Sequence, residues 1–158
     1  MIRIVAVGKI KEKSNKELIN EYVKRLTSYV KIEIIEVDEA LLSKNASEAD
    51  IESLKAKEAE RILAQVSSNQ YVVLLDLKGR NLSSVAFSDH LFKQYVYGKS
   101  DITFIIGGSH GVSQAVIDRA DFMLKLSEMT FPHQLARLIL IEQIYRAYKI
   151  HHNEPYHK

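Results

Sequence analysis

The chain has 158 residues, and its 22 Lys and Arg against 20 Asp and Glu give a formal net charge of +2, which neither requires nor excludes a nucleic-acid partner. It contains no cysteine, which excludes disulfide scaffolds, thiolate nucleophiles, cysteine-ligated zinc and iron–sulfur clusters. Hydrophobic residues make up 46% of the chain and charged residues 27%, so we predict one globular domain over residues 1–158. No apolar run approaches the roughly 20 residues that span a bilayer, and the start lacks a signal-peptide pattern. We therefore expect a cytoplasmic protein that does not enter a membrane.

Strands and helices are predicted to alternate in the first half of the chain. An apolar run predicts a strand over 2–7, and apolar residues at helical spacing predict a helix over 15–26. A second strand is predicted over 31–37, before a polar loop. Ser47 with Asp50 three residues later resembles a capping box, which predicts that a charged helix begins there and ends near residue 65.

The second half continues the same alternation. The pattern predicts a strand over 71–75, a turn over 76–80, a helix from Ser83 or Ser84 to Gly98, a strand over 102–106, a short helix over 114–120, a strand over 122–126 and a helix from Pro132 to about residue 150. Unbroken apolar strands that alternate with helices are typical of an α/β fold. We therefore predict a mostly parallel sheet with helices on both faces.

The last predicted helix carries apolar side chains beyond a single stripe. A helix of this kind needs a second partner to bury its extra apolar surface. That partner is either another subunit or the helix's own domain, if the helix lies at its centre. The pattern leaves both alternatives open.

Glycines gather where predicted strands end, above all at Gly107, Gly108 and Gly111. In open α/β sheets, ligands bind beyond the carboxyl ends of the strands. The cluster therefore predicts a ligand loop, although a strand-to-helix turn also favours glycine for its backbone freedom. The dinucleotide fingerprint is absent, because its first glycine position is Ile106.

Other site signatures are weak or missing. Gly98-Lys99-Ser100 lacks the partner glycine of a phosphate loop and lies between a helix and the next strand. None of the six histidines forms an H-E-x-x-H pattern, so no metal site is expected. His110 and His133 lie in two loops beyond strand ends, where a ligand is expected, whereas the apolar surroundings of His90 favour a structural role.

Several motifs along the whole chain resemble those of one bacterial methyltransferase family. They are MTFPHQ at 129–134, IEQIYRA at 141–147, FIIGG at 104–108 and PYHK at 155–158. The opening AVGK at 6–9 and the spacing Leu75-Asp76-x-x-Gly79 match as well. The family is RlmH, the pseudouridine methyltransferases of large-subunit ribosomal RNA within the SPOUT superfamily.

The resemblance implies an α/β fold with a carboxyl-terminal trefoil knot, which periodicity does not reveal. It also implies a homodimer that uses S-adenosylmethionine to methylate N3 of a pseudouridine in 23S rRNA on assembled ribosomes. No metal is required, because the cofactor's sulfonium is already the electrophile. The alternative is a non-catalytic RNA- or nucleotide-binding factor associated with the ribosome.

The site residues implied by the resemblance fall into three groups. Cofactor binding is expected at three strand ends, by Leu75, Gly107, Leu126, Ser127, Glu128, Met129, Thr130 and Phe131. His133 or a tail residue, Tyr156 or His157, is expected to act as a base or to orient the target, with capping of the last helix as the alternative for His133. Tyr156 is also suited to stack on a base. Phosphate contacts are expected from Arg137, Arg146, His157 and Lys158.

The tail from 151 to 158 is expected to have a function, with completion of the partner subunit's site as one option and simple exposure as the other. Two residues depart from the family pattern. His110 stands where relatives often carry Asn or Glu, and Val85 stands where an acidic residue is usual. These departures affect expected substrate contacts and leave the cofactor positions unchanged.

Overall fold

The strands of the protein form one parallel sheet in the order β2-β1-β4-β3-β5. The structure, a computed structural model, describes residues 1–157. The strands are β1 (Ile2–Val7), β2 (Ile32–Val37), β3 (Tyr71–Asn81), β4 (Ile102–Ile106) and β5 (Phe122–Lys125). The helices are α1 (Lys13–Leu26), α2 (Glu48–Leu63), α3 (Ser84–Val96), α4 (Gln114–Arg119) and α5 (His133–His151). The predicted α/β class and the parallel sheet are confirmed.

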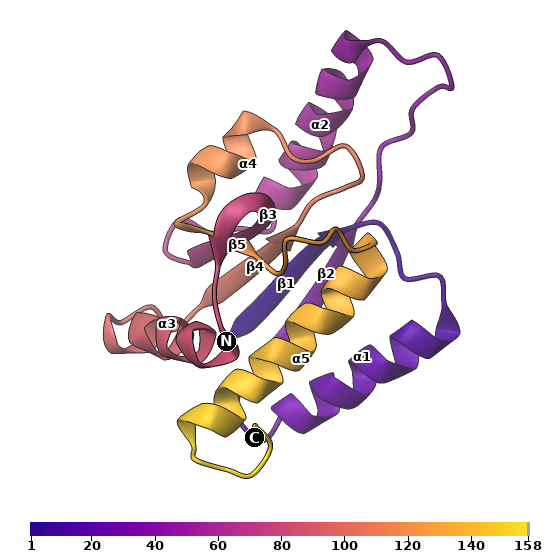
Figure 1. The fold of residues 1–158 in the computed structure, drawn as a ribbon. Coiled ribbons are helices and arrows are strands. Elements are labelled where there is room, and N and C mark those ends of the chain that lie inside the picture. The colour runs from indigo at the N-terminus through magenta and orange to yellow at the C-terminus, as the bar shows by residue number, and fades with distance from the viewer. Residues whose placement is uncertain (158) are drawn as a thin grey trace.

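Helices cover both faces of this sheet, as Figure 1 shows. On one face α5 lies between α1 and α3 and packs against both. On the other face α2 and α4 pack together. The central position of α5 accounts for its broad apolar surface, since Leu140, Ile141, Ile144 and Ala147 are fully buried.

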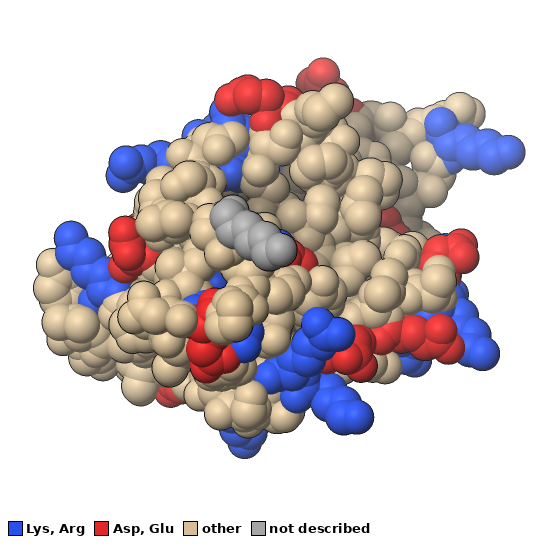
Figure 2. Space-filling model, turned by 60° about the horizontal axis from the view of Figure 1, so that its bottom comes forward, with Lys and Arg blue, Asp and Glu red and all other residues tan. Residues whose placement is uncertain are grey.

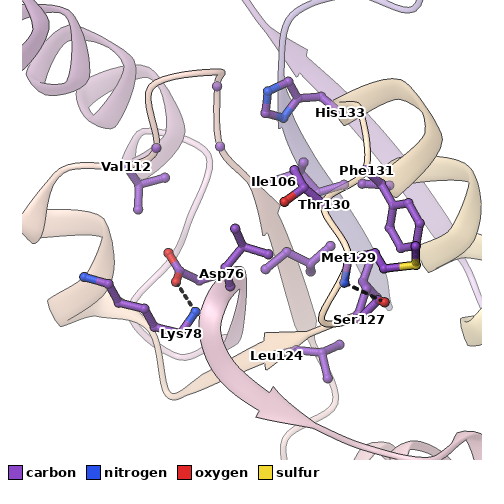
Figure 3. Close-up of a pocket in the computed structure, with 17 residues that line it drawn as sticks. Asp76, Lys78, Ile106, Val112, Leu124, Ser127, Met129, Thr130, Phe131 and His133 are labelled. Atoms are coloured by element: carbon purple, nitrogen blue, oxygen red, sulfur yellow. Dashed lines mark hydrogen bonds between the residues drawn. The ribbon is translucent and has the colours of Figure 1, made fainter.

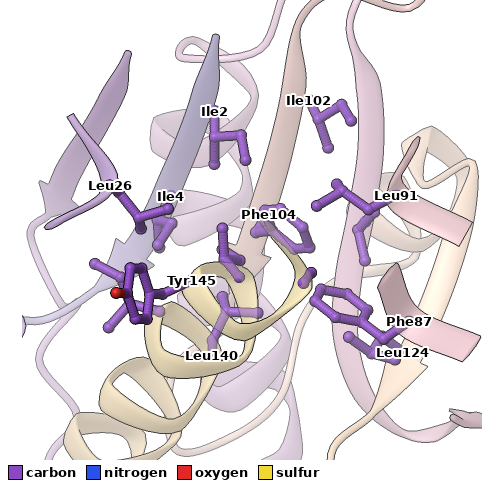
Figure 4. Packing of buried hydrophobic residues seen from close by; sticks show 14 of the residues in the cluster. Ile2, Ile4, Leu26, Phe87, Leu91, Ile102, Phe104, Leu124, Leu140 and Tyr145 are labelled. Atoms are coloured by element: carbon purple, nitrogen blue, oxygen red, sulfur yellow. The ribbon is translucent and has the colours of Figure 1, made fainter. Parts of the chain in front are cut away.

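The core is divided by the sheet into two apolar clusters. Along β1, Ile2 and Ile4 point towards α5, whereas Val5 points towards α2. In Figure 4, Leu140 and Tyr145 of α5 reach the β1 and β4 side chains on their face of the sheet. Because side chains alternate along a strand, an unbroken apolar run is buried on both faces only in a sheet that has helices on both sides.

The end of β3 differs from its prediction. Residues 76–79 leave the sheet as an arch, and Arg80 then pairs with the same residue of β5, Leu124, that Leu75 pairs with. The strand therefore continues to Asn81, beyond the predicted end at Leu75. A Cβ atom on Gly79 would lie 2.7 Å from backbone carbon atoms of Met123 and Leu124, so only glycine allows this approach.

The arch curves over β5 in Figure 1. Close contact between the arch and the strand that leads to α5 is consistent with the expected knot. The knot itself stays a prediction.

Helix boundaries agree with the sequence within a few residues. The capping box of α2 is present, since the Asp50 amide donates to Ser47 Oγ and the Ser47 amide donates to the Asp50 carboxylate. Ser83 caps α3 by accepting a hydrogen bond from the Ala86 amide at 3.1 Å. Pro132 is the N-cap residue of α5, one position before the helical position predicted for it.

Candidate functional site

A cavity of about 370 Å³ opens at the carboxyl ends of β3, β4 and β5. Its walls are the arch, the glycine turn 107–111, the loop 126–131 and the start of α5, as Figure 3 shows. The lining residues are Leu75, Asp76, Leu77, Lys78, Ile106, Gly107, Gly108, Gly111, Val112, Leu124, Leu126, Ser127, Met129, Thr130, Phe131, His133 and Ala136. The cavity lies where parallel α/β sheets bind their ligands.

The structure brings together most of the residues that the resemblance implies for a cofactor. Those that line the cavity are Leu75, Gly107, Leu126, Ser127, Met129, Thr130 and Phe131. Glu128 does not line it. Its side chain is 81% exposed and pairs with Lys125 at 2.5 Å between Nζ and Oε1, directed away from the cavity. Within the loop 126–131, Ser127 Oγ accepts a hydrogen bond from the Met129 amide at 3.0 Å, which fixes a tight bend.

The glycine turn keeps its side of the cavity open. The Gly111 amide donates to the Gly108 carbonyl at 3.1 Å, which closes the turn. A Cβ atom on Gly107 would lie 2.5 Å from Cγ1 of Val112, which itself lines the cavity. A larger side chain at position 107 therefore has to displace Val112 or enter the ligand space.

A buried acid packs against Gly108 on the side of α2. Glu58 of α2 is only 3% exposed, and its Oε1 accepts a hydrogen bond from the Ala40 amide at 3.0 Å. A Cβ atom on Gly108 would lie 2.7 Å from Glu58 Oε2. The turn therefore packs directly on Glu58 of α2.

Gly108 and Gly111, which the glycine cluster indicated, also line the cavity. Sequence reasoning missed seven lining residues: Asp76, Leu77, Lys78, Ile106, Val112, Leu124 and Ala136. Asp76 and Lys78 belong to the arch, where Asp76 Oδ1 accepts a hydrogen bond from the Lys78 amide at 2.7 Å. The spacing Leu75-Asp76-x-x-Gly79 was a usable signal for this segment. Apart from its place in the motif resemblance, the segment is predicted only as a turn, because only the pairing of β3 with β5 curves the arch over the cavity.

His133 lies at the start of α5 and lines the cavity. It is the first residue of the helix, and α5 has no side-chain cap. The alternative that His133 caps the helix therefore does not match the structure. An imidazole at this place is able to exchange a proton with a ligand in the cavity.

Arg137 does not match its expected contact with phosphate, because its side chain is buried and only 1% exposed. Its Nη1 pairs with Glu36 Oε1 at 2.5 Å, and its Nη2 donates to the Gly8 carbonyl at 2.9 Å. The same Glu36 oxygen accepts a hydrogen bond from the Ile10 amide at 3.0 Å. Arg137 thus ties the first turns of α5 to the ends of β1 and β2.

Arg146, Tyr156 and His157, which were predicted to contact RNA or to act from the tail, lie together beside α5. With Tyr22 and Glu142 they form what we call the tail cluster. Arg146 Nη2 pairs with Glu142 Oε1 at 2.6 Å, and the Tyr156 hydroxyl donates to the same oxygen at 3.1 Å. The Arg146 guanidinium lies 4.7 Å from the centre of the Tyr156 ring. Burial, with Tyr22 and Glu142 nearby, raises the pKa of Tyr156 above its ordinary value.

The tail cluster is separate from the cavity within one chain. Helix α5 rises about 1.5 Å per residue, so the thirteen residues from His133 to Arg146 span about 20 Å. Tyr156 and His157 accordingly do not line the cavity of their own chain. The remaining expected phosphate contact, Lys158, lies outside the described residues.

A second set of contacts holds the tail nearer the end of α5. The Tyr29 hydroxyl donates to Glu154 Oε2 at 2.6 Å, and Lys149 Nζ pairs with the same oxygen. The hydrogen bond from Lys149, reinforced by Tyr29, lowers the pKa of Glu154. The chain end is therefore bound to α5 and to the turn that follows α1.

Residues 1–157 contain no group of three His, Asp or Glu side chains placed to hold a metal ion. Over the same residues, none of the helices is both long and apolar enough to cross a membrane.

The chain matches the family model described as "Predicted SPOUT methyltransferase" over residues 1–157. It is 55% identical to the ribosomal RNA large subunit methyltransferase H of Carboxydothermus hydrogenoformans, over 99% of both chains. It is also 55% identical, with the same coverage, to the enzyme of that name from Ruminiclostridium cellulolyticum.

A solved structure, of a probable methylase family protein from Haemophilus influenzae, shares the fold. Its TM-score is 0.52 at 15% identity, over 99% of this chain and 70% of that one. Because the family model covers nearly the whole sequence and the full-length relatives are more than half identical, the chain belongs to the SPOUT methyltransferase family.

Proposed function

We propose that the protein methylates N3 of a pseudouridine in 23S rRNA on assembled ribosomes in the cytoplasm, with S-adenosylmethionine as cofactor. One observation carries the proposal. Seven of the eight residues that the family resemblance assigns to the cofactor line a single cavity at three strand ends. The full-length relatives named as large-subunit ribosomal RNA methyltransferases support the RNA substrate.

The cavity fits a nucleoside cofactor. Its volume of about 370 Å³ and its largely apolar walls are typical of a small-molecule site. Leu75, Leu126 and Phe131 offer apolar surface to an adenine ring, and the backbone of the loop 126–131 offers hydrogen bonds to its edge. When bound, S-adenosylmethionine supplies an activated methyl group.

The protein's own task is to align the target base and to remove its proton. N3 of pseudouridine carries a hydrogen that has to leave when the nitrogen is methylated. His133 lines the cavity at the start of α5, and we assign to its imidazole the acceptance of this proton. Orientation of the base by the same ring is the second role that this position supports.

A homodimer is the proposed assembly. Leu18 of α1 is 49% exposed and Leu135 of α5 is 39% exposed, and Leu138 and Ile139 line a hollow between these two helices. A second copy of the chain would cover this apolar surface. Because the tail cluster is about 20 Å from its own cavity, we propose that Tyr156, His157 and Arg146 act at the partner's cavity.

Net charge gives the protein little attraction for RNA by itself. In the view of Figure 2, Lys and Arg side chains are spread around the edges and mixed with Asp and Glu. The chain carries a net charge of only +2. We therefore propose that recognition depends on the shape of the ribosome and on a surface formed by two subunits.

The test is methyl transfer to ribosomes that lack the modification. We expect purified protein to transfer a labelled methyl group from S-adenosylmethionine to N3 of a single pseudouridine of 23S rRNA, and to transfer much less to free rRNA. Binding to ribosomes without transfer would instead identify the non-catalytic factor. Sedimentation of the same sample tests the dimer separately.

A further inference from the structure

The cavity contains one acidic group to which the proposed reaction assigns no role. Among residues 1–157, Asp76 contributes the only carboxylate to the cavity lining. It is half-buried at the start of the arch, directly after Leu75. Most of its neighbours around the cavity are apolar side chains or glycines.

The charge of Asp76 is not neutralised within the described part of the chain. Its Oδ1 accepts the Lys78 amide hydrogen at 2.7 Å, whereas Oδ2 has no hydrogen-bond partner there and neither oxygen forms an ion pair. Figure 3 shows the carboxylate on the side of the cavity that faces Val112, with the Lys78 side chain extended away from it. The backbone hydrogen bond orients the carboxylate and leaves one oxygen free for a ligand.

We propose that Asp76 is a cofactor-binding residue that favours the cationic methyl donor over its neutral product. The inference rests on the proposed function. The donor carries a positive sulfonium, and the product, S-adenosylhomocysteine, carries a neutral thioether in its place. A carboxylate in an apolar cavity attracts the first and has no such attraction for the second, because Coulomb interactions strengthen where water is scarce.

This selectivity has a kinetic consequence. The positive charge is largest on the free donor and is lost as the methyl group leaves. An interaction that is stronger in the ground state than later in the reaction improves binding without speeding the chemical step. Asp76 therefore lowers KM for the donor, does not raise kcat, and leaves the affinity for the product unchanged.

The experiment measures the affinity of S-adenosylmethionine and S-adenosylhomocysteine by calorimetry for the full-length protein and for Asp76→Asn. Asparagine keeps an oxygen for the Lys78 amide and removes only the charge. We expect the variant to bind the donor about tenfold more weakly and to bind the product almost as before. Its KM for the donor should rise, and its kcat should not fall.

The matched control is Asp89→Asn, which removes the same charge from an exposed position on α3 that does not line the cavity. It should leave both affinities unchanged. Equal weakening of donor and product in Asp76→Asn would overturn the inference, since it would place Asp76 at a part that the two molecules share. Unchanged affinity for both would overturn it as well.

A salt series on the unmodified protein tests the inference without any variant. Added salt should weaken the donor more than the product, because only the donor has the additional charge. Identical salt dependence would contradict the role of Asp76. If the unmodified protein binds neither molecule, the proposed function fails and this inference fails with it, which is distinct from the equal loss described above.

Discussion

The two ends of α5 differ in how they use hydrogen bonds. At its start, the cavity is formed by glycines, apolar side chains and backbone, and the polar groups of Asp76 and His133 remain available. Along its second half, the tail cluster saturates Glu142 with bonds from Arg146 and Tyr156. The first arrangement leaves groups free for a ligand, and the second locks the chain end in place.

Arg137 lies nearer the cavity end of α5, and its buried side chain connects the helix to the ends of β1 and β2.

The largest expected effect comes from Arg137→Met. It leaves Glu36 and the Gly8 carbonyl without their buried partner, so we expect the free energy of unfolding to fall by about 3 kcal/mol. Denaturant unfolding measures this change. The control is Arg25→Met, which removes an exposed pair with Glu21 and should cost less than about 0.5 kcal/mol. Equal losses in the two variants would show that the buried contacts of Arg137 contribute no more to stability than an exposed ion pair.

Gly107→Leu tests the cavity itself. The side chain has to displace Val112 or fill the ligand space, so we expect cofactor affinity to fall at least about 100-fold, or about 2.7 kcal/mol, while the fold is retained. Calorimetry and circular dichroism measure the two quantities. Ser109→Leu, which adds the same side chain at an exposed position outside the lining, should bind normally. Retained affinity in Gly107→Leu would mean that the turn has a structural role only.

His133→Ala separates binding from chemistry at the same end of α5. We expect kcat to fall about 100-fold, within the usual range for loss of a general base, and cofactor affinity to change little. Single-turnover methyl transfer and calorimetry provide the two values. His110→Ala, at the exposed tip of the glycine turn, is the control. Parallel losses of rate and affinity would argue against a base.

The smallest effect is expected at the tail. The pKa of Glu154 is lowered by Lys149 and Tyr29, so its bonds stabilise the tail above the ordinary glutamate value and are lost as the pH falls through the lowered one. The NMR signals of the Tyr29 ring should therefore titrate with a midpoint below the ordinary pKa of a glutamate. Glu154→Gln should abolish this titration. A midpoint at or above the ordinary value would show that the contacts do not form in solution.

The sequence alone predicted most of the secondary structure and the class of the fold. The strand Ile2–Val7, the strand Ile102–Ile106 and the capping box at Ser47 were correct, because apolar periodicity and capping are local properties. The motif resemblance also located the cavity-lining loop 126–131, apart from Glu128, whose side chain is exposed and pairs with Lys125. These features depend on residues that are close together in the chain.

Tertiary structure alone decided the rest. Arg137 resembles a surface cation in the sequence, and only the approach of β1 and β2 to α5 buries it. Asp76 joined the cavity because β3 resumes pairing with β5 after the arch, which a turn motif does not reveal. The 46% hydrophobic content predicted a globular chain, and the absence of cysteine excluded thiol chemistry. The net charge of +2 left the question of a nucleic-acid partner open. Contacts between residues tens of positions apart decide which polar groups stay free for a ligand. No local pattern in the sequence reveals these contacts.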